Sequence, residues 1–368
     1  IKFGNVTYNP GLLKFLDEII LNACDHCIET RKVTKIKITI TDEYISVYND
    51  GPGIPIRKHR DKDIYIPQLI FSEFLTSSNY NDNVKRLKSG LNGLGAKITS
   101  AFSKKFMIET VSNGQIYKQC FKDNLNIIEK PHIKSKKSKD YTRITFYPDF
   151  ERLKINKITE ESQRVLKRRA YDVAAYISTM GSKVKVYLND NHLPITTLKD
   201  YNEMFLNPEQ KEEVSYCSND RWSLGVCSSV DESFSCISFV NGVNTIDLGT
   251  HVDYILGQIC KVVSKKLGKS VKPLTIREQL HIVLFSRIEN PQFKSQAKEK
   301  LTTKVNEFGS EITIPPSFTK KILKMFFMKR LDNLLKFKEA QSLSIGNGKK
   351  KKKLLGIPNL DDANKAGG

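Results

Sequence analysis

Three polar side chains recur at helical spacing near the start of the chain. Glu18, Asn22 and His26 stand four residues apart, so a helix would stack them along one face. A carboxylate held on a rigid helix can act as a general base, and an amide oxygen suits Mg²⁺, which takes few protein ligands. A solvated polar helix face has the same pattern. The spacing alone therefore leaves a catalytic and a structural interpretation open.

Two glycine-containing turns follow these residues. Asn49-Asp-Gly-Pro-Gly53 ends a predicted strand, and Gly90-Leu-Asn-Gly-Leu-Gly95 opens a predicted helix at Ala96. Closely spaced glycines let the backbone approach a ligand and offer its N–H groups, which favours a phosphate cradle. The second turn is not a Walker A loop, because Ala96 separates Gly95 from Lys97, and it fits no dinucleotide fingerprint. Taken alone it is weak evidence for nucleotide binding.

Hydrophobic periodicity predicts the elements that position these motifs. Helices are expected over 10–29, 66–75, 159–180, 252–267 and 317–340, with another beginning at Ala96. Strands are expected over 35–40, 44–48, 106–111, 115–121, 142–147, 183–188, 222–227 and 236–240, with a β-rich run over 275–288. A boundary near Asn207-Pro208 divides the chain into parts 1–207 and 208–368, and each part is expected to be a sheet with helices on one face.

Composition indicates a folded, basic protein. The 368 residues include 60 Lys and Arg against 40 Asp and Glu, a net charge of +20, and 39% of them are hydrophobic. That apolar content excludes a wholly disordered chain, and no apolar run approaches the roughly 18 residues of a membrane span. A distributed positive charge favours a polyanionic partner, above all nucleic acid, although each basic run alone is typical of a solvated face.

The seven cysteines are typical of a reducing compartment, because their number is odd and their spacing forms no disulfide framework. Cys24 and Cys27 form a C-x-x-C pair inside the predicted helix 10–29, and no second pair exists to complete a zinc site. We therefore predict that both are buried core residues of that helix.

In combination, the motifs resemble the N, G1 and G2 boxes of the GHKL ATPase superfamily. Their individual residues resemble those of the ATPase region of eukaryotic-type DNA topoisomerase II. The resemblance covers essentially the whole chain. The matching strings are Asp17-Glu-Ile-Ile-Leu-Asn-Ala23, Asn49-Asp-Gly-Pro-Gly-Ile-Pro55, Leu75-Thr-Ser-Ser-Asn-Tyr80, Gly93-Leu-Gly-Ala-Lys97, Phe239-Val-Asn-Gly242, Gly249-Thr-His-Val-Asp-Tyr254, Glu289-Asn-Pro291, Ser295-Gln-Ala-Lys298 and Leu360-Asp-Asp-Ala-Asn364. It implies an α+β protein, in which a GHKL (Bergerat) ATP-binding α/β sandwich over 1–207 precedes a transducer domain over 208–368 with a β-α-β fold like that of ribosomal protein S5.

The resemblance also implies roles for individual residues. Glu18 resembles the general base that activates water, Asn22 the ligand of Mg²⁺, and Asn49 the residue that reads adenine. Gln296 and Lys298 resemble a loop of the second domain that reaches the γ-phosphate. The implied nucleotide-binding set is Asn22, His26, Asn49, Gly53, Ser77, Ser78, Asn79, Gly90, Leu91, Asn92, Gly93, Leu94, Gly95, Ala96, Lys97, Gln296, Ala297 and Lys298.

Three positions depart from the family pattern. Ala297 stands where the family usually has Thr, Leu91 where cellular relatives carry Arg, and His26 where an Asn usually helps to hold the nucleotide. These departures indicate a divergent member, and a large DNA virus is one origin that they raise as a hypothesis. They put nucleotide affinity, rather than the core chemistry, in question.

Partners follow from the same resemblance. ATP and Mg²⁺ are the implied cofactors, double-stranded DNA the implied substrate, and an ATP-dependent homodimer the implied assembly, with no membrane partner. The lysines expected to face DNA are Lys261, Lys265, Lys266, Lys269 and Lys272, while the run 349–353 could face DNA, flex, or act as a nuclear localisation signal. Location would follow the DNA, in the nucleus of a cell or in host cytoplasm for a cytoplasmic virus.

Other functions remain as alternatives. A MutL-type mismatch-repair ATPase shares the two-domain plan, a GHKL chaperone shares the nucleotide fold, and a nucleotide-switched DNA clamp would bind ATP without turnover. Ile1 is not Met and Gly368 ends the chain in mid-flow, so the sequence is interpreted as a piece of a longer polypeptide. The DNA-cleaving residues implied by the resemblance would then lie beyond Gly368.

Overall fold

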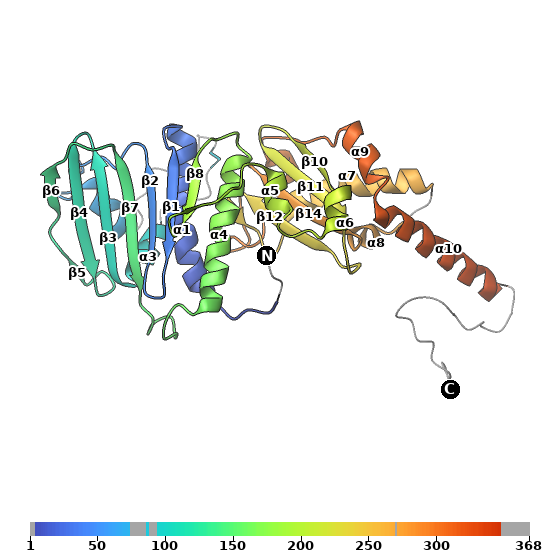
Figure 1. The fold of residues 1–368 in the computed structure, drawn as a ribbon, viewed down its shortest axis with the longest axis horizontal. Helices are drawn as coiled ribbons and strands as arrows, with labels where there is room; N and C mark the ends of the chain where they lie inside the picture. The colour runs from blue at the N-terminus through green and yellow to red at the C-terminus, as the bar shows by residue number, and fades with distance from the viewer. Residues whose placement is uncertain (1–3, 74–85, 88–93, 269–270, 347–368) are drawn as a thin grey trace.

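The computed structural model of the protein describes residues 4–73, 86–87, 94–268 and 271–346. Two sheets stand next to each other along the long axis of the molecule, and each carries its own helices (Figure 1). The fold is therefore α+β, as the sequence predicts. No helix in the described ranges is long and apolar enough to cross a membrane.

The first sheet is built from the N-terminal half of the chain. Its strand order is β5-β4-β3-β7-β2-β1-β8-β9, with β6 paired to β4, and β1–β8 is its parallel pair. Its strands are β1 (Lys35–Ile40), β2 (Ile45–Asp50), β3 (Ser103–Ser112), β4 (Gln115–Lys122), β5 (Ile127–Ile128), β6 (His132–Ser135), β7 (Tyr141–Pro148), β8 (Lys185–Leu188) and β9 (Asn191–His192). Its helices are α1 (Pro10–Thr30), α2 (Ile66–Ser72), α3 (Gly95–Ala101) and α4 (Glu160–Ser178).

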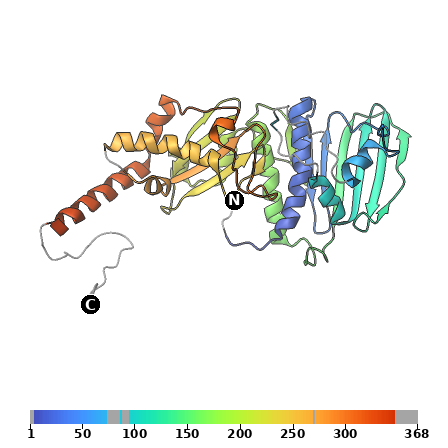
Figure 2. The same ribbon diagram turned by 180° about the vertical axis from the view of Figure 1, so that it is seen from behind.

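Helices cover one face of this sheet and leave the other open. Buried and partly exposed residues alternate along β1 and β2, the pattern of an antiparallel sheet with one solvated face. α1, α2 and α3 lie over the buried face (Figure 2), whereas the strands of the opposite face are seen uncovered in Figure 1. The one-face prediction is confirmed for this half.

The second sheet has the order β10-β11-β14-β12-β13. β12 and β14 are parallel and α7 lies between them in the chain, so the second half contains a β-α-β unit. Its strands are β10 (Ser215–Ser218), β11 (Trp222–Ser228), β12 (Ser235–Val240), β13 (Val243–Asn244) and β14 (Leu280–Ser286). Its helices are α5 (Leu198–Asn202), α6 (Pro208–Glu213), α7 (Thr250–Leu267), α8 (Pro273–Arg277), the 3₁₀ turn η1 (Val305–Glu307), α9 (Pro316–Ile322) and α10 (Phe326–Gly346).

The one-face prediction is wrong for the second sheet, because every residue of β11 and β14 is buried. One face packs under α7 through a core that includes Leu284 and Ile255. The other joins the core of the first half, where Phe285 stacks on Tyr176 of α4 with ring centroids 6.5 Å apart. The two sheets therefore share one continuous hydrophobic core across α4.

Two further predictions need correction. The start of the supposed β-rich run is helix α8, because Pro273 occupies a first-turn position where its missing N–H costs nothing. The last helix is broken into α9 and α10, since side chains from elsewhere hold the new helix start. The N–H of Phe326 donates to Glu213 Oε2 at 2.8 Å, and that of Phe327 donates to Ser228 Oγ at 3.0 Å.

Most other elements lie where periodicity places them, within a few residues. Helix 66–75 is described only as α2, which ends at Ser72. Cys24 and Cys27 are buried in α1, as predicted. The boundary at Asn207-Pro208 stays a prediction; Asn207 is the N-cap of α6, in the connection between the two sheets.

Candidate nucleotide-binding site

Helix α1 carries the central residues of the candidate site. Asn9 caps the helix, its side-chain oxygen accepting the Leu12 N–H at 3.1 Å, and Pro10 begins the first turn. The apolar stripe of α1 is buried against the sheet, which leaves the row of Glu18, Asn22 and His26 on the neighbouring face. The helix thereby fixes three predicted site residues along one line.

Glu18 is held by two cations and by a glycine. Its Oε1 lies 3.2 Å from Lys298 Nζ and 3.3 Å from Lys14 Nζ, and its side chain is 12% exposed. A Cβ on Gly95 would lie 1.9 Å from Glu18 Oε2, so only glycine fits there without displacing the carboxylate. Burial raises the pKa of Glu18, but the ion pairs with Lys298 and Lys14 outweigh it, so the pKa falls below its usual value. Glu18 is thus ionised at neutral pH and able to accept a proton.

Lys298 comes from the loop after β14, 280 residues away from Glu18 in the chain. The lysine is 7% exposed and its φ is 62°, in the left-handed region that non-glycine residues rarely adopt. Its backbone N–H donates to the Ser295 carbonyl at 3.0 Å, and Lys14 Nζ donates to the Ala297 carbonyl at 3.4 Å. Gln296 and Ala297 are exposed. The loop therefore turns a single cation inward.

The other end of the α1 row meets the turn after β2. His26 bonds to the Pro52 backbone, while its Nε2 is buried with no hydrogen-bond partner; burial lowers the pKa of the imidazole despite that bond. Asn49 is buried, and its Nδ2 donates to the Asp50 carbonyl at 3.0 Å. A Cβ on Gly53 would lie 1.9 Å from the Val111 carbonyl oxygen, so this glycine is required by packing.

The site is elongated. Eight residues of helix separate Glu18 from His26, which is roughly 12 Å at 1.5 Å per residue. Cations gather at the Glu18 end, whereas buried neutral groups lie at the His26 end. Exposed Asn22 lies between them. An extended ligand with an anionic end and a planar end fits this polarity.

The remaining predicted residues divide into two groups. Leu94 is the N-cap of α3, Ala96 is buried, and Lys97 is almost fully buried, so that burial lowers the pKa of its ammonium group. The others lie outside the described residues and stay predictions: Ser77, Ser78, Asn79, Gly90, Leu91, Asn92 and Gly93.

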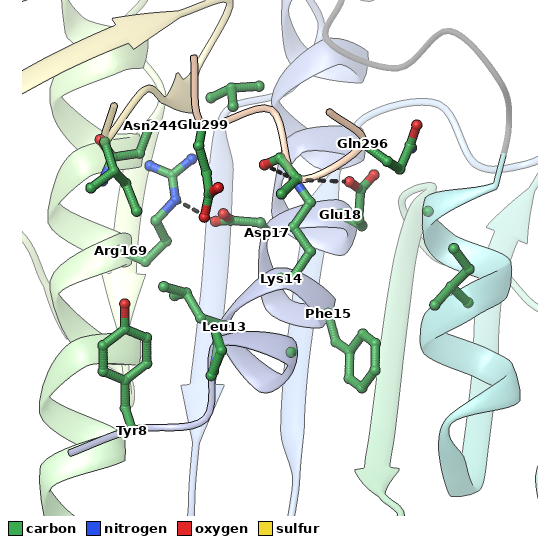
Figure 3. Close-up of a pocket in the computed structure, with 17 residues that line it drawn as sticks. Tyr8, Leu13, Lys14, Phe15, Asp17, Glu18, Arg169, Asn244, Gln296 and Glu299 are labelled. Atoms are coloured by element: carbon green, nitrogen blue, oxygen red, sulfur yellow. Dashed lines mark hydrogen bonds and ion pairs between the residues drawn. The ribbon is translucent and has the colours of Figure 1, made fainter. Parts of the chain in front are cut away.

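A cavity of about 380 Å³ borders Glu18 and lies between α1 and the second half of the chain (Figure 3). Leu13, Phe15 and Ile246 contribute apolar walls, and Gln296 borders it from the Lys298 loop. In this view Lys14 lies between Glu18 and the loop that carries Gln296, and dashed lines mark its contacts with Glu18 and with the Ala297 carbonyl. The junction between the two halves is therefore only partly filled.

Comparison with known proteins identifies the family. Residues 9–152 match the family described as histidine kinase-, DNA gyrase B- and HSP90-like ATPases, and residues 176–345 match the DNA gyrase B family. The ATPase region of Saccharomyces cerevisiae topoisomerase II superposes with a TM-score of 0.86 at 40% identity, covering 90% of this chain and 88% of that one. The chain belongs to the topoisomerase II family.

Other topoisomerase II relatives agree. The ATPase and transducer domains of the Balamuthia mandrillaris enzyme give a TM-score of 0.85 at 35% identity, over 91% of this chain and 87% of that one. DNA topoisomerase 2 of Penicillium chrysogenum is 38% identical over the whole of this chain, and that of S. cerevisiae is 39% identical over 99% of it. The chain spans about a quarter of the length of these two curated relatives, 24% and 27%. It corresponds to their ATPase region.

Two residues of this topoisomerase II ATPase region were missed by sequence reasoning. Lys14 pairs with Glu18, and the i,i+4 spacing could have revealed it. Arg169 of α4 is 3% exposed; its Nε donates to Asp17, its guanidinium also lies 3.5 Å from Asp172, and it donates to the Gly242 carbonyl of the β12–β13 turn. Nothing in its local sequence marks a buried contact between the halves.

Four of the five lysines predicted to face DNA are described, and all four are exposed. Lys261, Lys265 and Lys266 lie on α7, and Lys272 is the N-cap residue of α8. Lys269 and the run 349–353 lie outside the described residues. Exposure is compatible with DNA contact, which stays a prediction for this topoisomerase II chain.

Proposed function

We propose that this chain is the ATP-hydrolysing gate of a type II DNA topoisomerase. The observation that carries the proposal is the convergence of Glu18 and Lys298, 3.2 Å apart, from helix α1 of the first half and the loop after β14 of the second. A base and a cation that meet across two domains suit a reaction whose progress changes how the domains are held together.

The residues at the Glu18 end would perform the hydrolysis. Glu18, kept ionised by its cations, would orient the attacking water and accept its proton. Lys298 would stabilise the negative charge that develops on the phosphoryl group, and Gln296 would assist from the same exposed loop. Because Lys298 already pairs with Glu18, an incoming γ-phosphate would share this cation, which makes the loop sensitive to the nucleotide.

The other predicted residues would bind and orient the nucleotide. Asn49 and His26 would hold the base beside the turn at Gly53, while the glycine-rich segment ending at Gly95 would contact the phosphates. The close approach of Gly95 to Glu18 supports the phosphate contact, because no side chain lies between the end of this segment and the Glu18 carboxylate. The altered residues Ala297 and His26 leave the Glu18–Lys298 pair in place.

Magnesium fits the same site. Asn22 presents an exposed amide one helical turn from Glu18, and Mg²⁺ needs few protein ligands because waters and phosphate oxygens complete its octahedron. Bound there, the ion would neutralise phosphate charge. Asn22 would hold it, and Glu18 would remain free for the proton.

DNA and a second copy of the chain complete the proposal. Two copies would close around a DNA duplex on binding ATP, and the duplex would pass through a double-strand break made by another part of such an enzyme. The exposed lysines of α7 would face that duplex, and the protein would be located wherever the DNA is, in a nucleus or at a viral site in host cytoplasm. Similarity to topoisomerase II ATPase regions over about 90% of the chain favours this function over a MutL-type ATPase or a chaperone.

Glu18→Gln tests whether Glu18 is the general base, and a loss of hydrolysis in this variant would exclude a DNA clamp that binds ATP without turnover. We expect hydrolysis to fall by at least about 100-fold while binding of a non-hydrolysable ATP analogue persists, because the amide keeps the shape but cannot accept a proton. Molar mass in solution, with Mg²⁺ and the analogue, should shift from monomer to dimer in both proteins. Unchanged turnover in Glu18→Gln would refute the assignment, and a monomer that binds the analogue would remove the gate from this chain.

A further inference from the structure

The open face of the first sheet carries an ordered array of cations and tyrosines. We define the outer face as the side of β6, β4, β3, β7, β2, β1 and β8 that faces away from α1, and Figure 1 shows these strands without a helix over them. Cross-strand partners share a face, so the register places its members directly. They are the cations Lys35, Lys37, Lys105, Lys118, Lys122, Lys134, Arg143 and Lys185, the tyrosines Tyr44, Tyr48, Tyr141, Tyr147 and Tyr187, and the carboxylates Glu109 and Asp50.

The tyrosines hold several of these cations in place. Lys37 Nζ lies 5.6 Å from the Tyr187 ring centre, Lys105 Nζ lies 5.4 Å from that of Tyr147, and the Arg143 guanidinium lies 5.4 Å from that of Tyr48. Such contacts are worth about 0.5–1 kcal/mol each at exposed sites. With Lys136 beside Tyr141, four of the five rings have a cation nearby, so the face presents positive charge more than bare aromatic surface.

Sheet stability does not account for the charge pattern. Lys105 stands directly opposite Lys122, and Lys35 directly opposite Lys185. Like charges in opposing positions destabilise a sheet, whereas opposite charges would stabilise it. Of the two carboxylates, Asp50 accepts the backbone N–H groups of Thr34 and Lys35 and so is engaged with the backbone.

Glu109 and two edge carboxylates neutralise part of the array. Glu109 lies 2.6 Å from Lys118 Nζ and 3.6 Å from the Arg143 guanidinium. At the margins, Asp190 pairs with Lys37 and Glu129 with Lys122. Positive charge nevertheless remains in clear excess over the whole face, because Lys35, Lys105 and Lys185 have none of these carboxylate partners.

We propose that the outer face is a second contact surface for duplex DNA, bound through its phosphates. From β4 to β8 the face has five inter-strand spacings of about 4.8 Å, or about 24 Å, and a duplex of that length presents about 14 phosphates. The cations are spread in two dimensions, which suits the two phosphate strands of a duplex better than one extended strand. This surface is separate from α7, so it engages a DNA segment outside the one held by the proposed gate.

The test uses the full chain with a fluorescently labelled 20-base-pair duplex. In the double variant Lys105→Gln, Arg143→Gln we expect affinity to fall about 5- to 10-fold and the slope of log affinity against log salt to shrink by about two. The matched control is Lys157→Gln, Lys211→Gln, which removes two exposed lysines from elsewhere and should leave affinity nearly unchanged. Hydrolysis without DNA should be the same in all three proteins.

Each other outcome overturns the inference. Equal losses in both double variants would mean that only net charge matters, and no loss in either would mean that the face is not used. A preference for a single-stranded 20-mer that is lost in Tyr48→Leu would mean that the face binds single strands and not a duplex.

The double variant Lys265→Gln, Lys266→Gln tests the α7 contact separately. Failure of ATP hydrolysis would refute the proposed function without touching duplex binding at the outer face.

Discussion

Two cations, Arg169 and Lys298, make contacts between the halves of the molecule, and these contacts are built differently. Arg169 is 3% exposed and is enclosed by Asp17, Asp172 and the Gly242 carbonyl, so its guanidinium is bound on several sides. Lys298 makes one contact with Glu18 at 3.2 Å, from a loop whose neighbouring residues are exposed. The Arg169 contact is typical of a permanent connection, whereas the Lys298 contact is one that a ligand can exchange.

The difference suggests how hydrolysis could be coupled to domain movement. Asp17 and Glu18 are adjacent on α1, yet one is bound to the buried arginine and the other to the loop lysine. A fixed contact beside an exchangeable one would let the second half pivot without separating from the first. The following predictions test that contrast, beginning with the largest expected effect.

Arg169→Met should reduce the free energy of unfolding by about 3–5 kcal/mol, because it leaves buried Asp17 without its cation and buried Asp172 with Arg168 alone. Arg164→Met is the matched control on the same helix, where the pair with Glu160 is exposed to solvent and its loss should change stability little. Urea unfolding measures both. If Arg169→Met does not fold, Arg169→Lys, which keeps the charge but loses the planar fork, takes its place. If the Arg169 and Arg164 variants lose equal free energy of unfolding, the buried contacts of Arg169 are no more important for stability than an exposed ion pair.

Lys298→Met should lower kcat about 10- to 100-fold and reduce the free energy of unfolding less than Arg169→Met does, since Glu18 keeps its contact with Lys14. Lys300→Met, an exposed lysine of the same loop, should behave as the unchanged protein. Steady-state hydrolysis and urea unfolding are the measurements. A loss of stability comparable to that of Arg169→Met, with kcat intact, would reverse the assignment.

In Lys298→Met, the acid limb of the pH profile of ATP hydrolysis should move to higher pH. Lys298 helps to depress the pKa of Glu18, so removing it raises that pKa and protonates the base earlier as pH falls. The same sign applies to stability: because the folded-state pKa is lowered, the contribution is present above the usual carboxyl pKa and is lost as pH falls below it. The pH profile of kcat/KM checks the prediction, and an unmoved limb contradicts it.

Lys14→Met should have the smallest effect. An i,i+4 pair on a partly exposed helix face contributes about 0.2–0.5 kcal/mol, and we expect hydrolysis to change less than about threefold. Comparing Lys14→Met with Lys298→Met in one assay separates the two partners of Glu18. If the two variants lose activity equally, proximity to Glu18 matters more than the domain from which the lysine comes.

Local pattern was sufficient to predict the framework of the site. The stripe of α1 and the strand before Asn49 follow from periodicity, because one face of each is buried. Glu18 and Gly95 were both expected at the site, although their 1.9 Å constraint needed coordinates. Local sequence therefore predicted the helices and strands of the site and the kinds of residue that they carry.

Long-range contacts could not be predicted in the same way. The burial of Arg169 depends on a carbonyl 73 residues away, and the break before α10 depends on Glu213 and Ser228. One missed feature did have a signal: β14 reads Leu-His-Ile-Val-Leu-Phe-Ser with almost no polar alternation, which is typical of a strand buried on both faces.

The attachment of α10 makes that helix a lever. Its first two N–H groups are bound to Glu213 and Ser228, at the end of β11 and the helix before it, so the helix must turn with the second sheet. Its 21 residues extend about 31 Å at 1.5 Å per residue. A rotation of the sheet by about 10° would therefore carry the far end through roughly 5 Å, converting a change of one lysine contact into movement on the scale of a whole helical turn.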